Sequence, residues 1–306
     1  MKRRTRFFFE SRVATPFGEP QTTGHEVKKM STIVLYAYYE GGAYSKINLD
    51  FFLKHGLDPS FDLIIIVNGG LTSYPLIHAS DEDKKRIRLA QRENTGHDFG
   101  AWSYGLTKID MSKYEYFIFM NDTVIGPFYK TKQVWTKSIT RLLEYEHVGI
   151  AGIAINLVFE NYDHPHGRGS HVQTMMFAMK RNIVELVKPT FFNLNNLIMD
   201  RFDTITHREI GLSQYLLQRG YNIACLMKRY QNADGSPIDL RTPEQRNAIR
   251  NFPGWGNCLG NHTYDMISYF GTHIDPYETL FVKVNRNHPY TSYVYGQFLP
   301  SYVPPA

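Results

Sequence analysis

Residues 92–127 place the strongest constraint on the fold of this chain. They begin as RENTGHDFGAWSYGL, which has the pattern of a loop followed by a helix, and end as YEYFIFMNDTVIGP. The apolar run at residues 116–120 predicts a buried strand, and Asn121, Asp122 and Thr123 follow it directly. Polar side chains at the carboxyl end of a buried strand are typical of the ligand-binding edge of an open α/β sheet. We therefore expect the functional site at this edge.

Further strands and helices are predicted on both sides of this segment. The strands are expected at residues 32–38, 61–67, 86–90, 147–156 and 172–179, and the helices at residues 44–55, 134–146 and 206–219. The run at residues 61–67 is almost entirely apolar and ends at Asn68-Gly69-Gly70, as a central parallel strand does. Alternation of strands and helices indicates a right-handed wound sheet, so the predicted fold class is α/β.

Composition predicts how the 306 residues are organised. Residues 1–29 mix basic, Pro, Gly and Thr residues without periodicity, which indicates a loosely ordered N-terminal extension. Residues 30–290 are expected to form a single domain, and residues 291–306 a C-terminal tail. The Gly- and Pro-rich residues 232–260 indicate a long surface loop that could act as a lid.

The charge balance bears on the kind of ligand. The chain has 34 basic and 29 acidic residues, a net charge of +5, which suits phosphate-bearing or other anionic ligands. A mildly basic surface without a charged partner is the alternative. The basic residues are scattered and form no stripe with aromatic residues, so nucleic-acid binding is not expected.

The cysteines and the hydropathy bear on the compartment. Cys225 and Cys258 are too few for a disulfide framework and lack metal-ligand spacing, so a reducing, cytoplasmic location is expected. No apolar run approaches the roughly 18 residues of a membrane-spanning helix. Peripheral association with a membrane surface stays open.

The loop-to-helix sequence RENTGHDFGAW has more small and polar residues than a helix start needs. Gly96 and Gly100 would let the backbone approach a ligand closely, and Asp98 could accept hydrogen bonds from sugar or ribose hydroxyls. The alternative is that Thr95 or Asp98 caps the following helix. The two interpretations are compatible, because a helix N-terminus is also an anion-binding site.

The triplet at residues 121–123 is a candidate cation site. A carboxylate between two oxygen-bearing side chains matches what a hard divalent cation on a diphosphate requires. The alternative is an Asx-type turn that leads into Gly126-Pro127.

Several aromatic and polar residues are candidates for contacts with a ligand. Tyr36 and Tyr38 alternate along the first strand and share a face on which a nucleotide base could stack, with core packing as the rival interpretation. His171 and Gln173 also share a face and could bind sugar hydroxyls, although a satisfied histidine without a ligand is the alternative. Trp255 lies in the predicted lid and could cover a sugar ring or simply anchor the loop.

Three motifs together resemble known enzymes. REIGLSQYLLQRGY, at residues 208–221, resembles the base-bearing helix of inverting GT-A glycosyltransferases, in which Asp or Glu lies eleven residues before the Gly of Gly-Tyr. Glu209 has this spacing to Gly220. RENTGHDFGAW and FIFMNDTVIGP resemble the rhamnan-synthesis F type of glycosyltransferase domain, a group related to transferases of bacterial and algal-virus glycan assembly. The resemblance covers roughly residues 31–225.

The resemblance implies a GT-A, Rossmann-like sheet that is mixed but mainly parallel, and an inverting transfer of one sugar from a nucleotide-sugar donor to a glycan acceptor. The donor half would be residues 30–155 and the acceptor half residues 156–290, with UDP-xylose or UDP-glucose favoured as donors and Glu209 as the general base. A viral protein of this type would act in the host cytoplasm. The implied acceptor residues are His171, Gln173 and Trp255. The implied donor-binding residues are Tyr36, Tyr38, Asn68, Arg92, Asn94, Gly96, Asp98, Asn121 and Asp122.

The implied cofactor is Mn²⁺ or Mg²⁺ at Asp122. The commonest GT-A metal motif is Asp-any-Asp, whereas this chain has Asn121 and Thr123 at the first and third places. Basic residues such as Arg92 or Lys130 could therefore neutralise the leaving diphosphate instead.

Two other functions compete with this one. A sugar-phosphate nucleotidyltransferase would need an early Gly-rich loop with basic residues, but the segment YEGGA after the first strand has no basic residue before Lys46. A carbohydrate-binding module without catalytic activity would use the tyrosines and His171 to hold a glycan.

Overall fold

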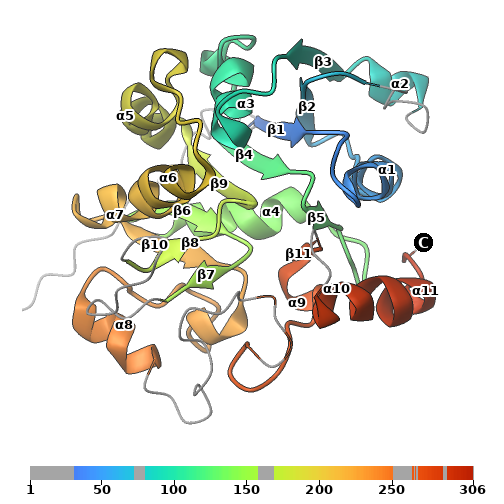
Figure 1. Cartoon of the computed structure of the whole chain (residues 1–306). Helices are drawn as coiled ribbons and strands as arrows, with labels where there is room; N and C mark the ends of the chain where they lie inside the picture. Colours follow the sequence, from blue (N-terminus) through green and yellow to red (C-terminus); the bar gives the residue numbers. More distant parts are fainter. Residues whose placement is uncertain are drawn as a thin grey trace, which may run out of the picture.

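A central seven-stranded sheet organises the computed structural model, which describes residues 31–71, 80–157, 169–250, 264, 266, 268–284 and 288–305 (Figure 1). The strand order is β10-β6-β9-β4-β1-β2-β3. All strands are parallel except β9, which is antiparallel to β4 and β6. The predicted α/β class, with a mixed and mainly parallel sheet, is confirmed. The strands are β1 (Thr32–Tyr38), β2 (Phe61–Asn68), β3 (Ile87–Arg92), β4 (Tyr116–Asn121), β6 (Val148–Gly152), β9 (Met176–Lys180) and β10 (Asn222–Cys225).

Helices cover both faces of this sheet. Those that follow the first strands are α1 (Ser45–His55), α2 (Asp81–Lys84), α3 (His97–Leu106), η1 (Met111–Lys113), α4 (Trp135–Thr140) and η2 (Arg141–Glu144). The middle of the chain adds α5 (Arg181–Phe191), η3 (Leu194–Asn196), α6 (Arg201–Thr204), the π-helix η4 (Ile205–Ile210), α7 (Gly211–Leu217) and η5 (Lys228–Tyr230). The last part contains α8 (Pro243–Arg250), α9 (Pro276–Thr279), α10 (Pro289–Tyr293), the π-helix η6 (Val294–Phe298) and α11 (Leu299–Ser301).

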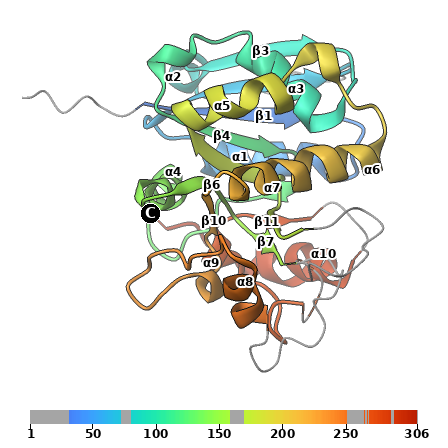
Figure 2. The ribbon, with the colours of Figure 1, turned by 90° about the vertical axis from the view of Figure 1, so that its left-hand side faces the viewer.

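Aromatic side chains fill the space between the sheet and its helices. On one face, Trp102 of α3 packs edge-on against Phe119 of β4 and Phe177 of β9, with ring centroids 5.8 and 5.3 Å apart. Figure 2 shows α3 and α5 in front of the strands on this side. On the other face, Phe52 of α1 and Trp135 of α4 pack edge-on with centroids 6.0 Å apart. The residues between the two helix layers are therefore buried, as the apolar strands require.

Two predicted strands are each divided in the structure. Residues 147–156 form β6 and then β7 (Ile155–Asn156), and residues 172–179 form β8 (His171–Val172) and then β9. The chain leaves the large sheet at these breaks, and β7 pairs with β8 in a separate two-stranded sheet. Continuous hydrophobicity does not reveal such breaks, because both parts of each segment are buried.

The C-terminal residues differ from the predicted tail. They are helical through α10, η6 and α11, and Figure 1 shows these red helices below α1. Tyr290, Val294, Phe298 and Tyr302 recur every four residues and are all buried. The first three lie in α10 and η6 at a spacing typical of one helix face, whereas Tyr302 follows α11. The apolar repeat could therefore have predicted the packing of these helices. β5 (Val124–Ile125) pairs with β11 (Val282–Lys283) nearby.

Some predictions concern residues without a description here. The N-terminal extension at residues 1–29 and Trp255 lie outside the described residues. In the described part of the chain, no helix is both long enough and apolar enough to cross a membrane.

The packing of the C-terminal helices predicts the effect of Phe298→Ala. The Phe298 ring lies edge-on to Phe128 with centroids 5.0 Å apart, and only 9% of Phe298 is exposed. We expect the free energy of unfolding, measured in urea, to fall by about 3 kcal/mol because the substitution leaves a cavity. The control is Val303→Ala, which should change it little because Val303 is 80% exposed. Equal, negligible effects of both substitutions would show that this segment is a tail.

Candidate active site

The carboxyl ends of β1 and β4 form the point at which the strand order reverses. β1 pairs with β2 on one side and with β4 on the other, and such a switch point is where open α/β sheets bind ligands. The Asp122 N–H donates to the Ala37 carbonyl over 3.1 Å, and the Tyr39 N–H donates to Asp122 Oδ2 over 2.7 Å. Asn48 Nδ2 donates to the Asp122 carbonyl over 2.7 Å. Asp122 therefore joins the ends of both strands to α1.

Burial raises the pKa of Asp122 to about 7, and the nearby Asp98 carboxylate contributes to the increase. Hydrogen bonds from the Tyr39 N–H and the Ser45 hydroxyl lower the pKa but do not offset the burial. Asp122 is thus only partly ionised at neutral pH, although its sequence position suggested a permanent charge.

Asn121 connects the end of β4 to the first turn of α3. Its Nδ2 donates to Asp98 Oδ2 over 2.7 Å, while its Oδ1 accepts from the Thr123 N–H and Oγ1 at 3.1 and 2.6 Å. The contact to Thr123 is the Asx-type turn that the sequence left as an alternative. Burial raises the pKa of Asp98, although the Asn121 hydrogen bond and the charges of His97 and Lys283 lower it.

Glu209, on the π-helix η4, lies opposite the loop between β8 and β9. Its Oε2 accepts hydrogen bonds from the Thr174 N–H at 2.9 Å and from Thr174 Oγ1 at 2.6 Å. Its Oε1 lies 3.7 Å from His171 Nε2. Because the Gly169 carbonyl can only accept, the 3.0 Å contact from His171 Nδ1 places a hydrogen on that nitrogen. The structure thus brings together Glu209 and His171, which the sequence assigned to the same half of the site.

The charge state of Glu209 follows from these contacts. Burial alone would raise its pKa, but His171, Lys283 and the two hydrogen bonds from Thr174 together lower the pKa below the ordinary value of a glutamate. Glu209 is therefore ionised throughout the neutral range.

Lys283 is a residue that the sequence reasoning missed. It pairs with Val124 in the β5–β11 ladder, and the next residue, Val284, donates its N–H to the Thr123 carbonyl over 2.8 Å. Its charge lowers the pKa of both Asp98 and Glu209. Lys283 therefore acts electrostatically on carboxylates of both α3 and η4. The alternation in FVKV, at residues 281–284, is the only sequence signal for this short strand.

Tyr36 and Tyr38 are buried, in agreement with the core-packing interpretation. Tyr36 has no exposed surface, and its ring centroid lies 5.5 Å from that of Phe52. Tyr38 is 2% exposed. In this structure neither ring presents a face on which a nucleotide base could stack.

Arg92 and Asn68 bind each other and the loop before α3. Arg92 Nη1 donates to Asn68 Oδ1 and to the Thr95 carbonyl, both over 2.8 Å, and Nη2 donates to Thr95 Oγ1 over 2.7 Å. A Cβ atom at Gly100 would lie 2.2 Å from the same Thr95 carbonyl oxygen. The guanidinium thus holds the loop. Gly100 is required because a side chain there would collide with Thr95, and not because a ligand approaches its backbone.

Gly96 also has a packing role. It has a φ of 67°, which L-residues rarely adopt, and a Cβ atom there would lie 3.0 Å from the Leu197 side chain. Gly96 is the N-cap of α3, and neither Thr95 nor Asp98 provides a side-chain cap. The alternative interpretation, in which Thr95 or Asp98 caps the helix, is therefore wrong.

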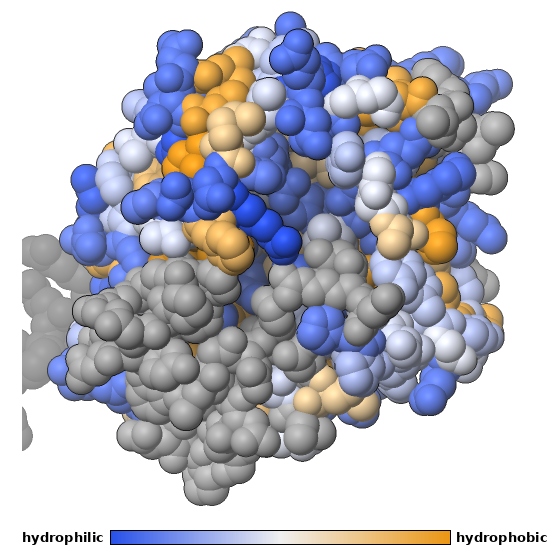
Figure 3. Space-filling view, viewed as in Figure 1, coloured by the Kyte–Doolittle hydropathy of each residue, from blue (hydrophilic) through white to orange (hydrophobic). Residues whose placement is uncertain are grey.

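The remaining predicted residues lie in different surroundings. Lys130 is exposed and pairs with Asp275 at 3.9 Å, and Asn94 is exposed. Gln173 is 5% exposed, and its Oε1 has no hydrogen-bond partner among the described residues. Figure 3 shows hydrophilic residues above a hollow near the centre of this face, which suits polar ligands.

The raised pKa of Asp122 predicts how stability depends on pH. Stability gained from the protonated carboxyl is complete below the unfolded-state pKa and is lost as pH rises through about 7. Between pH 5.5 and 8.5 the wild type should therefore lose about 2 kcal/mol more than Asp122→Asn, as measured by urea unfolding. Asp81→Asn is the control because the Asp81 side chain is 96% exposed. If the free energy of unfolding of the wild type and of Asp122→Asn changes with pH in parallel, the pKa of Asp122 is not raised in the folded state.

Comparison with known proteins gives one family. No curated protein matches the chain. One similar solved structure is mannosyltransferase PcManGT from Pyrobaculum calidifontis in complex with GDP-Man and Mn²⁺, with 10% identity and a TM-score of 0.40. The match covers 72% of this chain and 59% of that chain. Residues 63–242, more than half of the chain, match the family model of rhamnan synthesis protein F. The chain therefore belongs to the rhamnan synthesis protein F family of glycosyltransferases, as its motifs predicted.

Proposed function

We propose that the protein transfers one sugar from a nucleotide-sugar donor to a hydroxyl of a glycan acceptor, with inversion at the anomeric carbon. The main support is the arrangement around Glu209, an ionised carboxylate held by Thr174 and His171 at the same sheet edge as Asp98 and Asp122. A base and a polar donor-binding edge are the two parts that an in-line displacement requires. Family membership supports the same reaction.

Glu209 acts as the general base in this proposal. Because Thr174 holds Oε2, the carboxylate has a defined orientation, and Oε1 on the His171 side accepts the proton of the acceptor hydroxyl. The acceptor oxygen forms its bond to the anomeric carbon as the bond to the diphosphate breaks, and that electron pair leaves on the diphosphate oxygen. A lowered pKa makes Glu209 a weaker base but keeps it unprotonated, and proton transfer that accompanies bond formation uses this state.

The diphosphate is placed at the ends of β1 and β4. Lys283 supplies positive charge there. It replaces the two candidates from the sequence, because Arg92 binds Asn68 and Thr95, and Lys130 is exposed beside Asp275. A positive group at a leaving diphosphate stabilises the charge that develops in the transition state.

Two carboxylates at the same place could contribute to a divalent cation site, although they do not form a complete one. Within the described ranges, no group of three or more His, Cys, Asp or Glu residues could hold a metal ion. However, burial raises the pKa of Asp122 and the nearby Asp98 carboxylate adds to the increase, so the two carboxylates are close enough to interact. Mg²⁺ is often held by one or two carboxylates plus substrate phosphates. Asp98 and Asp122 would hold Mn²⁺ or Mg²⁺, and the ion would offset the negative charge of the diphosphate.

The acceptor is placed beside His171 and Gln173. Gln173 Oε1 is buried and has no partner in the part of the chain that the structure describes, so it can accept a hydrogen bond from a sugar hydroxyl. In this proposal residues 30–155 form the donor half and residues 156–290 the acceptor half. A cytoplasmic location is also part of the proposal, in agreement with the buried, unpaired Cys225.

A thermal-shift screen tests the donor and the cation together. UDP-xylose and UDP-glucose are proposed ahead of rhamnose donors, and GDP-mannose is a further comparison. A bound donor at about a hundred times its Kd should stabilise the fold by about 2.7 kcal/mol, and more with Mn²⁺ present. Slow release of free sugar and nucleotide from the same mixture would exclude a purely carbohydrate-binding module.

The matched variants for this screen are Lys283→Met and Lys130→Met. Loss of a charged hydrogen-bond partner should weaken binding of the nucleoside diphosphate about tenfold or more in Lys283→Met. Lys130→Met should bind it like the wild type, because Lys130 is exposed. If Lys283→Met binds UDP and GDP unchanged, the diphosphate does not lie beside β11.

Glu209→Gln tests the base. We expect kcat to fall by about 10²- to 10⁴-fold while the donor Kd stays unchanged, because only proton transfer is lost. Initial rates at saturating acceptor and donor titrations by calorimetry measure the two quantities. Glu185→Gln is the control, since Glu185 is an exposed glutamate of α5. Near-normal turnover by Glu209→Gln would rule out Glu209 as the base.

A further inference from the structure

Arg208, the residue before Glu209, is a buried cation without an acidic partner among the described residues. It is 5% exposed, and burial lowers its pKa. None of the ion pairs formed within the described ranges includes it. Burying an unpaired charge is costly, so the contacts of its guanidinium need a reason.

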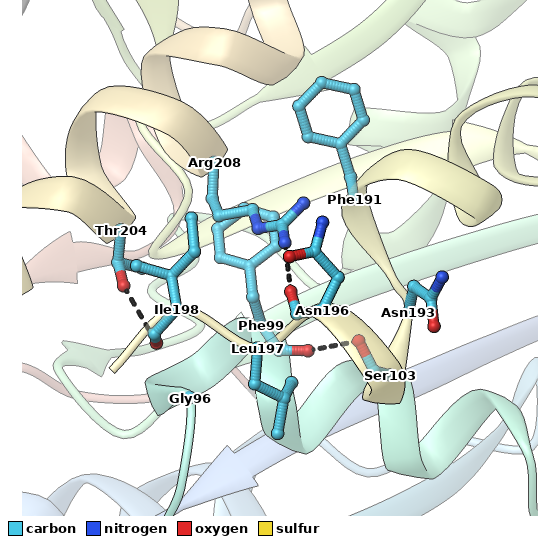
Figure 4. A pocket seen from close by; sticks show the side chains of 10 residues that line it. All are labelled: Gly96, Phe99, Ser103, Phe191, Asn193, Asn196, Leu197, Ile198, Thr204 and Arg208. Carbon is cyan, nitrogen blue, oxygen red and sulfur yellow. Dashed lines mark hydrogen bonds between the residues drawn. The ribbon is translucent and has the colours of Figure 1, made fainter. Parts of the chain in front are cut away.

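The guanidinium of Arg208 binds the ends of two helices. Nη1 donates to the Thr190 carbonyl in the last turn of α5, and Nη2 donates to the Asn196 carbonyl at the end of η3. Carbonyls at a helix C-terminus lack N–H partners within the helix, and a cation there is favourable. Figure 4 shows the guanidinium directed at Asn196 in a small pocket that also contains Phe99 and Leu197.

The segment that Arg208 holds also contacts the donor side of the site. Leu197 packs against Gly96, and His97 Nε2 lies 2.9 Å from the Met199 carbonyl oxygen. Gly96 and His97 directly precede Asp98, so η3 and the following residues lie between the start of α3 and η4. Arg208 therefore connects the helix that carries Glu209 to the segment that supports Asp98.

The helix around Arg208 has an unusual geometry. Residues 205–210 form a π-helix between α6 and α7, and such turns are frequent at functional sites. Consecutive helical residues point in different directions, and here Arg208 contacts α5 and η3 while Glu209 contacts Thr174. The two residues thus make contacts on different sides of one turn.

We propose that Arg208 is a positioning residue for Glu209. Its hydrogen bonds to the Thr190 and Asn196 carbonyls hold the π-turn in the orientation that directs the Glu209 carboxylate at Thr174 and His171. This inference rests on the proposed role of Glu209 as the base. It assigns to Arg208 no contact with either substrate.

Arg208→Met, which keeps the chain length but removes the charge and the donors, tests this role. We expect kcat to fall about tenfold to a hundredfold with the donor KM unchanged, because orientation of the base affects the transition state alone. The acid limb of the pH profile of kcat should move to higher pH. The reason is that Glu209 would lose the contacts that lower its pKa. A purely structural role would lower the melting temperature without moving this limb.

A second readout does not depend on activity. Titration of the Glu209 carboxyl carbon by NMR should give a higher pKa in Arg208→Met than in the wild type. Arg208→Lys keeps the charge and a donor, so it should fold even if Arg208→Met does not. We expect it to give a Glu209 pKa and a kcat between those of the wild type and Arg208→Met. The control is Arg219→Met, because Arg219 is exposed on the surface after α7 and stacks on Tyr215.

The outcomes separate the two proposals. An unchanged Glu209 pKa and an unchanged acid limb in folded Arg208→Met or Arg208→Lys would overturn the role of Arg208, whatever Glu209→Gln does. Full turnover by Glu209→Gln would overturn the role of Glu209 as the base, and the NMR titration would still report whether Arg208 orients the carboxylate.

Discussion

The hydrogen bonds of Asp122 across the junction of β1 and β4 are the interaction on which the site depends. Its N–H, carboxylate and carbonyl bind Ala37, Tyr39 and Asn48, respectively. Tyr295 of the C-terminal helices in turn donates its hydroxyl to Asn48 Oδ1 over 2.6 Å. The sheet, α1 and the end of the chain are therefore connected through two buried residues, Asp122 and Asn48. Burial in this connection raises the pKa of Asp122, because it leaves little solvation for the charged carboxylate.

The sequence could predict the features that depend on neighbouring residues. The strand before Asn121 and the helix that carries Glu209 follow from hydrophobic periodicity and a glycine stop, and both are present in the structure. Lys283 could not be found in this way. It reaches the site because β11 pairs with β5, more than 150 residues earlier in the chain, and neither strand has more than two residues. Such a pairing leaves almost no periodic signal.

Residue type alone also left the roles of several loop residues undetermined. A glycine can be needed because a ligand or because a neighbouring side chain lies close to its backbone. At Gly96 that neighbour is the Leu197 side chain. An arginine suits a diphosphate as well as a backbone carbonyl, and Arg92 binds the Thr95 carbonyl. These alternatives differ only in what lies opposite the residue in space. The burial of Tyr36 is a further example, since a strand pattern gives its face but not the helix that covers it.

The direction of β9 has a consequence for how this site can diversify. β9 runs opposite to β4 and β6, so the chain enters β9 at the edge where it leaves the other two strands. Asp122 therefore follows a strand, whereas Thr174 precedes one. Insertions or deletions before Gly169 would change the chain that leads to His171 and Thr174 without shifting the pairing of β1 with β4. In the proposed function, acceptor preference can thus vary between relatives while the edge at β1 and β4, where the donor is proposed to bind, stays constant.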